Sequence, residues 1–236
     1  MLRSGKGLCM KGLSESLWPR DIQSARLLQQ TLSKTVALQP LTKPPRLIGG
    51  VDACYTERRV VAAASLFTYP DLRYLDDALA REVIRFPYVP GFLSFREGPA
   101  VIGALRRLKA PPDVVLFDGQ GIAHQDGLGI ASHVGVILDI PTIGCAKSRL
   151  VGEFKEPWPY KGDWEELYFH GRVIGAVVRT RDRVKPVFVS PGHRIDLKTS
   201  IDIVMHSISL YRLPDPIRHA DHLSRKAAKE EAEHEQ

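Results

Sequence analysis

The sequence predicts an α/β fold in which helices flank a mixed β-sheet. Two apolar runs of strand length follow one another as a meander in residues 46–69, and from residue 94 onward short apolar strands alternate with amphipathic helices. The strands of a meander pair antiparallel, whereas strands that alternate with helices favour parallel pairing. Both kinds of pairing are therefore expected in one sheet with helices on its faces.

The size and composition of the chain are those of a globular protein with one core. It has 236 residues, of which 44% are hydrophobic and 25% are charged, which is enough to bury one sizeable core. We predict a single domain over residues 1–236, with residues 1–17 as a flexible extension. Residues 225–236 are predicted to be a charged, solvated tail that is either helical or disordered. We expect a monomer.

Apolar runs and cysteines indicate the compartment. No run approaches the length of about eighteen apolar residues that a membrane span requires, so no membrane partner is expected. The three cysteines, Cys9, Cys54 and Cys145, are odd in number and far apart in the sequence. They fit neither a disulfide framework nor a zinc site. A cytoplasmic location is the simplest expectation.

The first half of the chain predicts a helix followed by strands. Residues 21–38 place apolar residues at helical spacing behind Asp21, a good helix cap. The runs "RLIGGVDACYT" and "VVAAASLFTY" predict an antiparallel hairpin. Residues 71–85 fit two structures, because their alternation favours a third strand whereas their local propensity favours a helix.

The second half predicts alternating helices and strands. Residues 94–109 predict a helix that ends in basic residues, as suits its C-terminus. The apolar run in "PDVVLFDGQG" predicts a short buried strand that stops at a glycine turn. The remaining predicted elements are a helix over residues 128–139, a strand over 141–147, strands over 172–180 and 186–192, and a helix over 196–210.

Three acidic residues lie in or beside apolar segments and are candidates for a functional site. Asp52 lies inside "LIGGVDACY", where a buried and unpartnered charge would cost several kcal/mol. Asp118 ends "VVLFD", and Glu97 lies in the first turn of the predicted helix. Taken singly, each fits a turn former or a helix N-terminal charge. A sheet can bring a carboxylate on its first strand beside one at the carboxyl end of a later strand, with the helix supplying a third. Three such carboxylates would need a cation, and their hard oxygens suit Mg²⁺ or Mn²⁺.

A histidine and a lysine are candidates to assist such a site. In "DGQGIAH", Gly119 and Gly121 let the backbone approach a ligand closely, and His124 could serve as a donor or proton shuttle. Lys147, after the predicted strand "TIGCA", could neutralise a phosphate. The alternative is that His124 is a solvated loop histidine and that Lys147 is a solvated lysine at a strand end.

The charge of the chain favours a polyanionic partner. The net charge is +6 and the isoelectric point is about 9.3, and the acid-rich end "KEEAEHEQ" leaves the rest of the chain more basic still. Nucleic acid is the partner that such an excess typically attracts. A basic protein that binds no polyanion has the same charge, so the charge alone does not decide.

Several motifs resemble the endonuclease V family of the ribonuclease H-like superfamily. They are "GGVDACY", "FPYVPGFLSFREGP", "SPGHRIDLKTSIDIV", "LPDPIRHAD" and the long segment that begins "PDVVLFDGQGIAH". The resemblance implies a ribonuclease H-like fold and a Mg²⁺ site, with Mn²⁺ as a substitute, made by Asp52, Glu97 and Asp118. It also implies that His124 and Lys147 lie near the scissile phosphate. Asp221 matches a late polar position of variable type and is a candidate fourth ligand.

The resemblance also implies how a damaged base is recognised. The segment "PYVPG" is similar to the family's wedge, in which Tyr88, Val89 and Pro90 would enter the helix where the base leaves it. Prolines restrict the backbone, so such a tip needs little ordering on binding. The structural alternative is that Tyr88 packs with Phe86 under the helix.

The activity implied is that of a deoxyinosine endonuclease that initiates DNA repair. Such an enzyme cuts the second phosphodiester 3′ to the lesion and leaves 3′-hydroxyl and 5′-phosphate ends. Amides of Gly119 to Gly121 would read the hypoxanthine base. The pocket positions that match the family are Leu93, Gly129, Ile130 and Leu150, for which core and turn roles remain the alternative. Two other functions stay open, an endonuclease that acts on inosine in RNA and a catalytically silent nucleic-acid binder.

Overall fold

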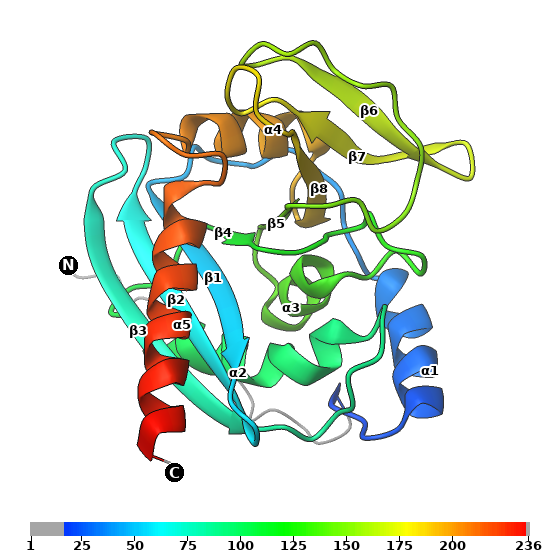
Figure 1. Ribbon diagram of the computed structural model, residues 1–236. Coiled ribbons are helices and arrows are strands. Elements are labelled where there is room, and N and C mark those ends of the chain that lie inside the picture. The colour runs from blue at the N-terminus through cyan, green and yellow to red at the C-terminus, as the bar shows by residue number, and fades with distance from the viewer. Residues whose placement is uncertain (1–16, 235–236) are drawn as a thin grey trace, which may run out of the picture.

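An eight-stranded mixed sheet forms the middle layer of the protein, in a computed structural model that describes residues 17–234 (Figure 1). The strands are β1 (Leu47–Tyr55), β2 (Arg59–Thr68), β3 (Tyr74–Val83), β4 (Val114–Phe117), β5 (Thr142–Ala146), β6 (Trp164–Phe169), β7 (Arg172–Val178) and β8 (Val187–His193). Their order across the sheet is β3-β2-β1-β4-β5-β8-β7-β6. The β1–β4 and β4–β5 pairs are parallel and all other pairs are antiparallel. The predicted mixed sheet is confirmed.

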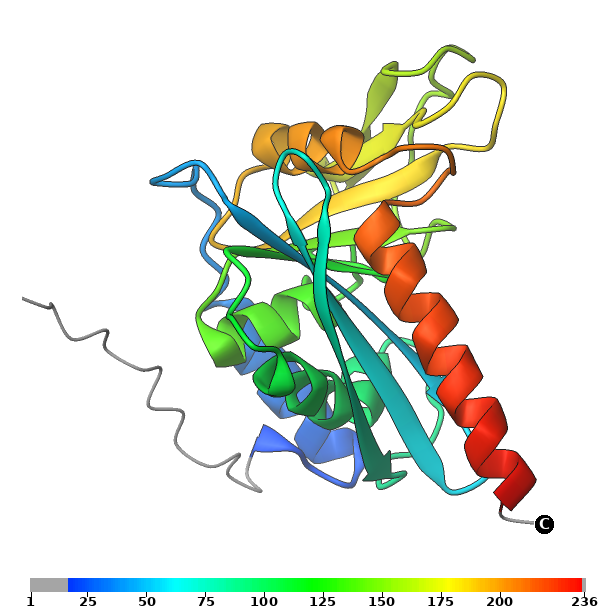
Figure 2. The same cartoon turned by 90° about the vertical axis from the view of Figure 1, so that its left-hand side faces the viewer.

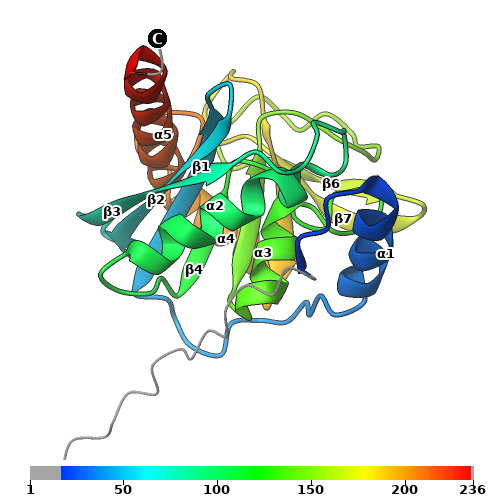
Figure 3. The ribbon, with the colours of Figure 1, turned by 90° about the horizontal axis from the view of Figure 1, so that it is seen from below.

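Helices cover both faces of this sheet. They are α1 (Ile22–Ser33), α2 (Leu93–Arg107), α3 (Ile130–Leu138), α4 (Leu197–His206) and α5 (Asp215–His234). The helices α2 and α3 pack on one face, and α4 and α5 pack on the other. Figure 2 shows α2 and α3 on the opposite side of β1 and β2 from α5. Seen from below, α1 lies beside α3 on the face of α2 and α3 (Figure 3). None of the helices within residues 17–234 is long and apolar enough to cross a bilayer.

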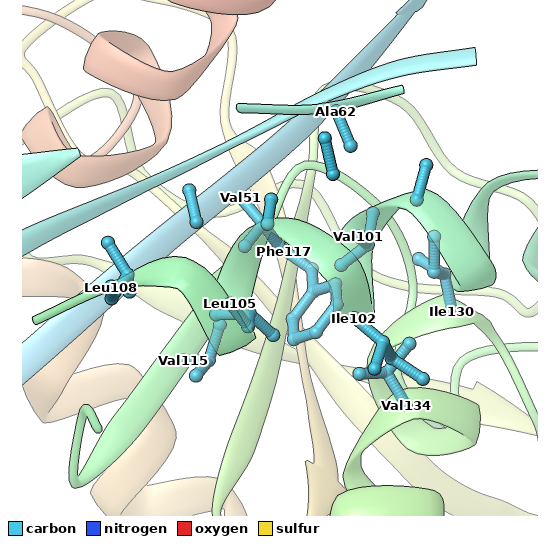
Figure 4. Packing of buried hydrophobic residues seen from close by; sticks show 14 of the residues in the cluster. Val51, Ala62, Val101, Ile102, Leu105, Leu108, Val115, Phe117, Ile130 and Val134 are labelled. Atoms are coloured by element: carbon cyan, nitrogen blue, oxygen red, sulfur yellow. The ribbon is translucent and has the colours of Figure 1, made fainter. Parts of the chain in front are cut away.

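The short strand β4 supplies side chains to both cores. Val115 and Phe117 pack with residues of α2 and α3 (Figure 4), whereas Val114 and Leu116 pack with residues of α4 and α5. All four side chains are buried, which explains why "VVLF" is continuously apolar instead of alternating. Asp118, the residue after β4, therefore follows a strand that is packed on both faces.

The structure decides between the two alternatives for one segment and differs from the prediction at two others. Residues 74–83 form a strand and not a helix, because β3 pairs along its length with β2 and this pairing outweighs local helical propensity. The edge strand β6 was not predicted, since "WEELYF" carries two glutamates and lacks a clear apolar pattern. The first helix ends at Ser33, five residues before the predicted end at residue 38.

The charged end of the chain is a packed helix. Helix α5 continues through residue 234, and Ala227 and Ala228 are buried against Val61 of β2. Of the two forms predicted for residues 225–236, the structure has the helix, through residue 234. One side of this helix is packed against the sheet and is not solvated. The predicted flexible extension, residues 1–17, lies outside the described residues except for residue 17.

Candidate active site

Two of the predicted acids lie side by side on neighbouring parallel strands, Asp52 within β1 and Asp118 directly after β4. Val51 of β1 is opposite Phe117 of β4, so the next residues, Asp52 and Asp118, are neighbours. Val51 and Phe117 point into the core beneath α2 and α3 (Figure 4). Because side chains alternate along a strand, Asp52 faces the other side of the sheet, where α5 lies.

Helix α5 carries a third acid, Asp221, to the same place. The helix starts against β1 at Gly50, where a Cβ atom would lie 2.1 Å from the carbonyl carbon of Pro216. Only glycine permits that approach. Ser65 of β2 donates a hydrogen bond to the Pro216 carbonyl oxygen at 2.7 Å and so ties the start of α5 to the sheet.

The carboxylates of Asp52, Asp118 and Asp221 form a cluster of oxygen ligands. One oxygen of each lies within 4.8 Å of the other two. Burial, with repulsion from the other two acids, raises the pKa of Asp52 to about 6. The Nζ atom of Lys147 lies 2.5 Å from Oδ2 of Asp118 and 3.8 Å from Oδ1 of Asp221. This lysine supplies part of the positive charge that the cluster requires.

The donor set of the cluster fits a hard divalent cation. All its ligands are carboxylate oxygens, which Mg²⁺ and Mn²⁺ prefer, and within residues 17–234 neither a cysteine nor a histidine joins them. Lys147 and Arg225, whose Nε lies 3.0 Å from Oδ1 of Asp221, offset the three negative charges only in part. The residues present therefore suit such an ion.

A buried serine on α5 orients one of these ligands. The hydroxyl of Ser224 donates to Oδ2 of Asp52 at 2.8 Å, and this bond lowers the pKa of Asp52 against the larger effect of burial. Sequence reasoning did not identify Ser224. The signal available was its spacing of three residues from Asp221, which places both on one face of a helix.

Glu97 approaches from the opposite face of the sheet and is not one of the three clustered acids. It lies on α2 and accepts a short hydrogen bond from the hydroxyl of Tyr55 on β1. Burial raises the pKa of Glu97 to about 7, with further repulsion from Asp52 and Asp118. The charges of Asp52 and Asp118 thus act on Glu97, although its Oε1 atom is hydrogen-bonded to Tyr55.

Both ring nitrogens of His124 are occupied. Its Nδ1 accepts the backbone N–H of Asp126 at 3.1 Å, so Nε2 carries the proton and donates to the Gly91 carbonyl oxygen at 3.0 Å. Burial lowers the pKa of His124, which keeps the ring neutral. In this arrangement His124 ties two loops together, and it lines the same cavity as Asp118 and Lys147.

A cavity of about 380 Å³ adjoins the carboxylate cluster. Its lining includes Asp118 and Lys147 of the cluster region. The predicted pocket and wedge residues on its walls are Tyr88, Val89, Pro90, Leu93, Gly119, Gly129, Ile130 and Leu150. Gly121 does not line the cavity, contrary to expectation: its N–H donates to Ser190 Oγ at 2.8 Å, and a Cβ there would meet the Pro191 carbonyl oxygen at 2.1 Å.

The aromatic residues of the predicted wedge divide between core and surface. Phe86 is buried against Phe92 and Phe95 at the start of α2, whereas Tyr88 is 71% exposed. Of the structural alternative, the packing of Phe86 is present and that of Tyr88 is not. An exposed aromatic side chain therefore stands at the mouth of the cavity on a proline-restricted segment.

Comparison with known proteins gives a consistent match. The family model described as Endonuclease V matches residues 30–222. An endonuclease V of Dictyoglomus turgidum is 48% identical over 216 residues, which cover 92% of this chain and 95% of the relative. The crystal structure of an endonuclease V from Streptomyces avermitilis has a TM-score of 0.86 at 39% identity and covers 90% of this chain and 95% of that chain.

A further structural match comes from a nucleic-acid complex. The Ciona intestinalis endonuclease V, in complex with a 23mer DNA containing an inosine followed by a ribo-adenosine, has a TM-score of 0.79 at 28% identity. It covers 89% of this chain and 97% of that chain. The region that the family model matches contains all the acids of the site. The chain therefore belongs to the endonuclease V family and is an endonuclease with the ribonuclease H-like fold.

Proposed function

We propose that the protein recognises deoxyinosine in DNA and hydrolyses the second phosphodiester 3′ to it, with Mg²⁺ or Mn²⁺ as cofactor. The observation that carries this proposal is the position of Asp118, which belongs both to the carboxylate cluster and to the wall of the adjoining cavity. A base held in that cavity keeps its own strand beside the carboxylates. The solved complex of a relative with inosine-containing DNA supports the choice of substrate.

The carboxylates and their neighbours have separate roles in this proposal. Asp52, Asp118 and Asp221 would hold the cation, which when bound supplies charge stabilisation at the phosphate and an activated water. Lys147 lies within 2.5 Å of Asp118 and would neutralise a phosphate oxygen brought to that residue. Glu97, with a pKa of about 7, is suited to hold or release a proton near neutral pH.

The cavity provides the means to select the base. Flipping costs least for a mispaired base, which is one source of selectivity, and Tyr88 would fill the space that the base leaves. The amides of Gly119 and Gly121 donate inside the protein, to the Phe117 carbonyl and to Ser190. Of the three amides expected to read the base, we therefore assign that role to Gln120, whose backbone N–H has no acceptor within residues 17–234.

A nicking assay tests the proposal directly. Supercoiled plasmid with one deoxyinosine should be nicked only when Mg²⁺ or Mn²⁺ is present, and a labelled oligonucleotide should map the cut to the second bond 3′ to the lesion, with a 5′-phosphate end. Asp118→Asn should abolish nicking while the protein still retards inosine-containing DNA in a gel. The control is Asp71→Asn, an exposed acid on a turn. Wild-type binding without nicking at any metal concentration would leave only a silent binder.

Two further measurements define the nucleic acid. Matched single strands of DNA and RNA with one inosine should be cut at different rates, and faster cleavage of RNA would replace deoxyinosine by inosine in the proposal. Affinity for DNA should fall steeply with salt, because a chain with net charge +6 binds phosphates with release of counterions. An affinity independent of salt would contradict the role of the basic excess.

A further inference from the structure

A fully buried amide side chain on α1 bridges two walls of the base cavity. Gln29 has no exposed surface, and its Nε2 donates to the Gly91 carbonyl oxygen at 2.9 Å and to the Leu128 carbonyl oxygen at 3.4 Å. Gly91 and Leu128 both line the cavity. The two N–H groups of one side chain therefore reach segments that are 37 residues apart in the sequence.

Each of these segments leads directly to residues of the cavity wall. Gly91 follows Tyr88, Val89 and Pro90 and precedes α2, whereas Leu128 precedes Gly129 and Ile130 at the start of α3. Figure 3 shows α1 beside α3, and the Gln29 side chain reaches from α1 to both segments. Gln29 does not itself line the cavity, so it links the two walls from behind them.

The Gly91 carbonyl accepts a second hydrogen bond, from Nε2 of His124 at 3.0 Å. A carbonyl oxygen has two lone pairs, and both are used here by side chains from different segments. Gly91 has a φ of 82°, in the left-handed region where glycine is favoured. The turn that ends the wedge is therefore held by its carbonyl oxygen as well as by its backbone conformation.

The burial of Gln29 requires a reason beyond packing. Its neighbour on the same face, Ala25, is apolar and fully buried, and an apolar residue at position 29 would avoid the desolvation of an amide. The Oε1 atom of Gln29 is buried without a hydrogen-bond donor in the described part of the chain. The amide of Gln29 therefore uses its N–H groups but not its oxygen. Its hydrogen bonds join Gly91 to Leu128.

We propose that Gln29 is a positioning residue for base recognition, which sets the width of the cavity and the angle of the wedge without touching the substrate. This inference rests on the proposed function for the identity of the base. Its mechanical part, the restraint of the wedge turn by α1, concerns the free protein. The two parts are therefore tested separately.

The restraint is measured by hydrogen exchange in the absence of DNA. Gln29→Met keeps the length of the side chain and removes both donors, and Gln30→Met changes an exposed neighbour on the same helix. Amides of the peptide spanning residues 86–96 should exchange about three- to tenfold faster in Gln29→Met, the effect of one lost hydrogen bond, and at the wild-type rate in Gln30→Met. Unchanged exchange in Gln29→Met would overturn the proposal. If that variant does not fold, Gln29→Leu takes its place.

The consequence is measured by steady-state cleavage of inosine-containing duplex. Gln29→Met should raise KM about three- to tenfold and leave kcat and Mn²⁺ affinity in calorimetry unchanged, because the carboxylate cluster is untouched. A fall in kcat with unchanged KM would overturn the positioning role. If the wild-type protein fails to prefer inosine, the proposed function is wrong, whereas faster exchange at residues 86–96 in Gln29→Met would still establish the restraint.

Discussion

The hydroxyl of Ser224 lies 2.8 Å from Oδ2 of Asp52 and joins the last helix to the first strand, 172 residues apart in the sequence. The same hydroxyl lies 3.1 Å from the Asp221 carbonyl oxygen. A serine hydroxyl has one proton, and the shorter contact to a charged acceptor is the stronger one. Ser224 therefore directs its proton to Asp52, which favours the ionised form of a carboxylate that burial pushes toward protonation.

Ser224→Ala should weaken binding of a divalent cation. Partners of metal ligands orient the ligand and keep it basic, and their loss typically costs about 10- to 100-fold in metal affinity or activity. Calorimetric titration with Mn²⁺ in the absence of DNA measures the affinity, and nicking activity as a function of Mg²⁺ concentration gives a second reading. Ser224→Thr retains the hydroxyl and serves as the control. Equal affinity in wild-type and alanine proteins would show that Asp52 is oriented without Ser224.

Tyr88→Ala should weaken binding to duplex more than binding to single strands. Tyr88 is 71% exposed, so removal of its ring leaves the core intact. A stacked aromatic ring contributes about 1–3 kcal/mol in nucleic-acid binding. We expect a loss of about tenfold in affinity for inosine-containing duplex and a smaller loss for an unpaired strand, where no wedge is needed. Gel retardation measures both. The control is Tyr160→Ala, at a residue that is 60% exposed. Equal losses of affinity for duplex and single strand in Tyr88→Ala would argue against wedging.

The pattern of the sequence was sufficient to predict the central part of the fold. Apolar runs predict the hairpin of β1 and β2 and the short buried strand β4. In the structure, the parallel pairing of β1 with β4 brings Asp118, the residue after β4, beside Asp52. Edge strands are weaker signals, because pairing with a neighbour decides their structure. For this reason β6 was missed and residues 71–85 stayed ambiguous.

Contacts between distant segments were beyond sequence reasoning. The motifs indicated Asp221, but the bond from Ser224 to Asp52 depends on how α5 lies across β1. The commitment of the Gly121 amide to Ser190 and of His124 to Gly91 likewise depends on loop packing. Residue type and spacing indicate which residues belong to a site. The packing of distant segments determines which of their hydrogen-bonding groups already have partners within the protein.

Gly50→Ala should displace α5 and with it two residues of the site. The added methyl group would lie 2.1 Å from the Pro216 carbonyl carbon and 2.3 Å from its oxygen, and backbone cannot give way as a flexible side chain can. We expect a loss of stability of at least about 1–3 kcal/mol, as for overpacked cores, and a fall in Mn²⁺ affinity. Thermal unfolding and calorimetry measure these effects. Gly49→Ala, whose nearest contact is the Pro112 side chain at 3.1 Å, should be milder; identical effects would contradict the role of the α5 crossing.

His133 should make the protein less stable in acid. It is fully buried, with Nδ1 at 2.9 Å from Ser94 Oγ, and burial lowers its pKa to about 3. The ordinary histidine pKa is about 6.5. As the pH falls below about 6.5, this histidine takes up a proton in the unfolded chain but not in the folded protein. The contribution of His133 to stability is therefore fully present above that pH and is lost progressively toward pH 3. Because one pKa unit corresponds to about 1.4 kcal/mol, the full loss of stability from this residue is on the order of a few kcal/mol.

Comparison of variants isolates this contribution from the acids of the site. Asp52 and Glu97, with pKa values raised to about 6 and about 7, act in the opposite direction, because the folded protein binds their protons first and gains stability as the pH falls through those values. Urea unfolding of wild type and His133→Gln at pH 7 and pH 5 should therefore give a smaller loss on acidification in the variant. His222→Gln, at an exposed position on α5, should keep the wild-type dependence. Parallel curves for wild type and His133→Gln would mean that the buried ring accepts its proton as readily in the folded protein as in the unfolded chain.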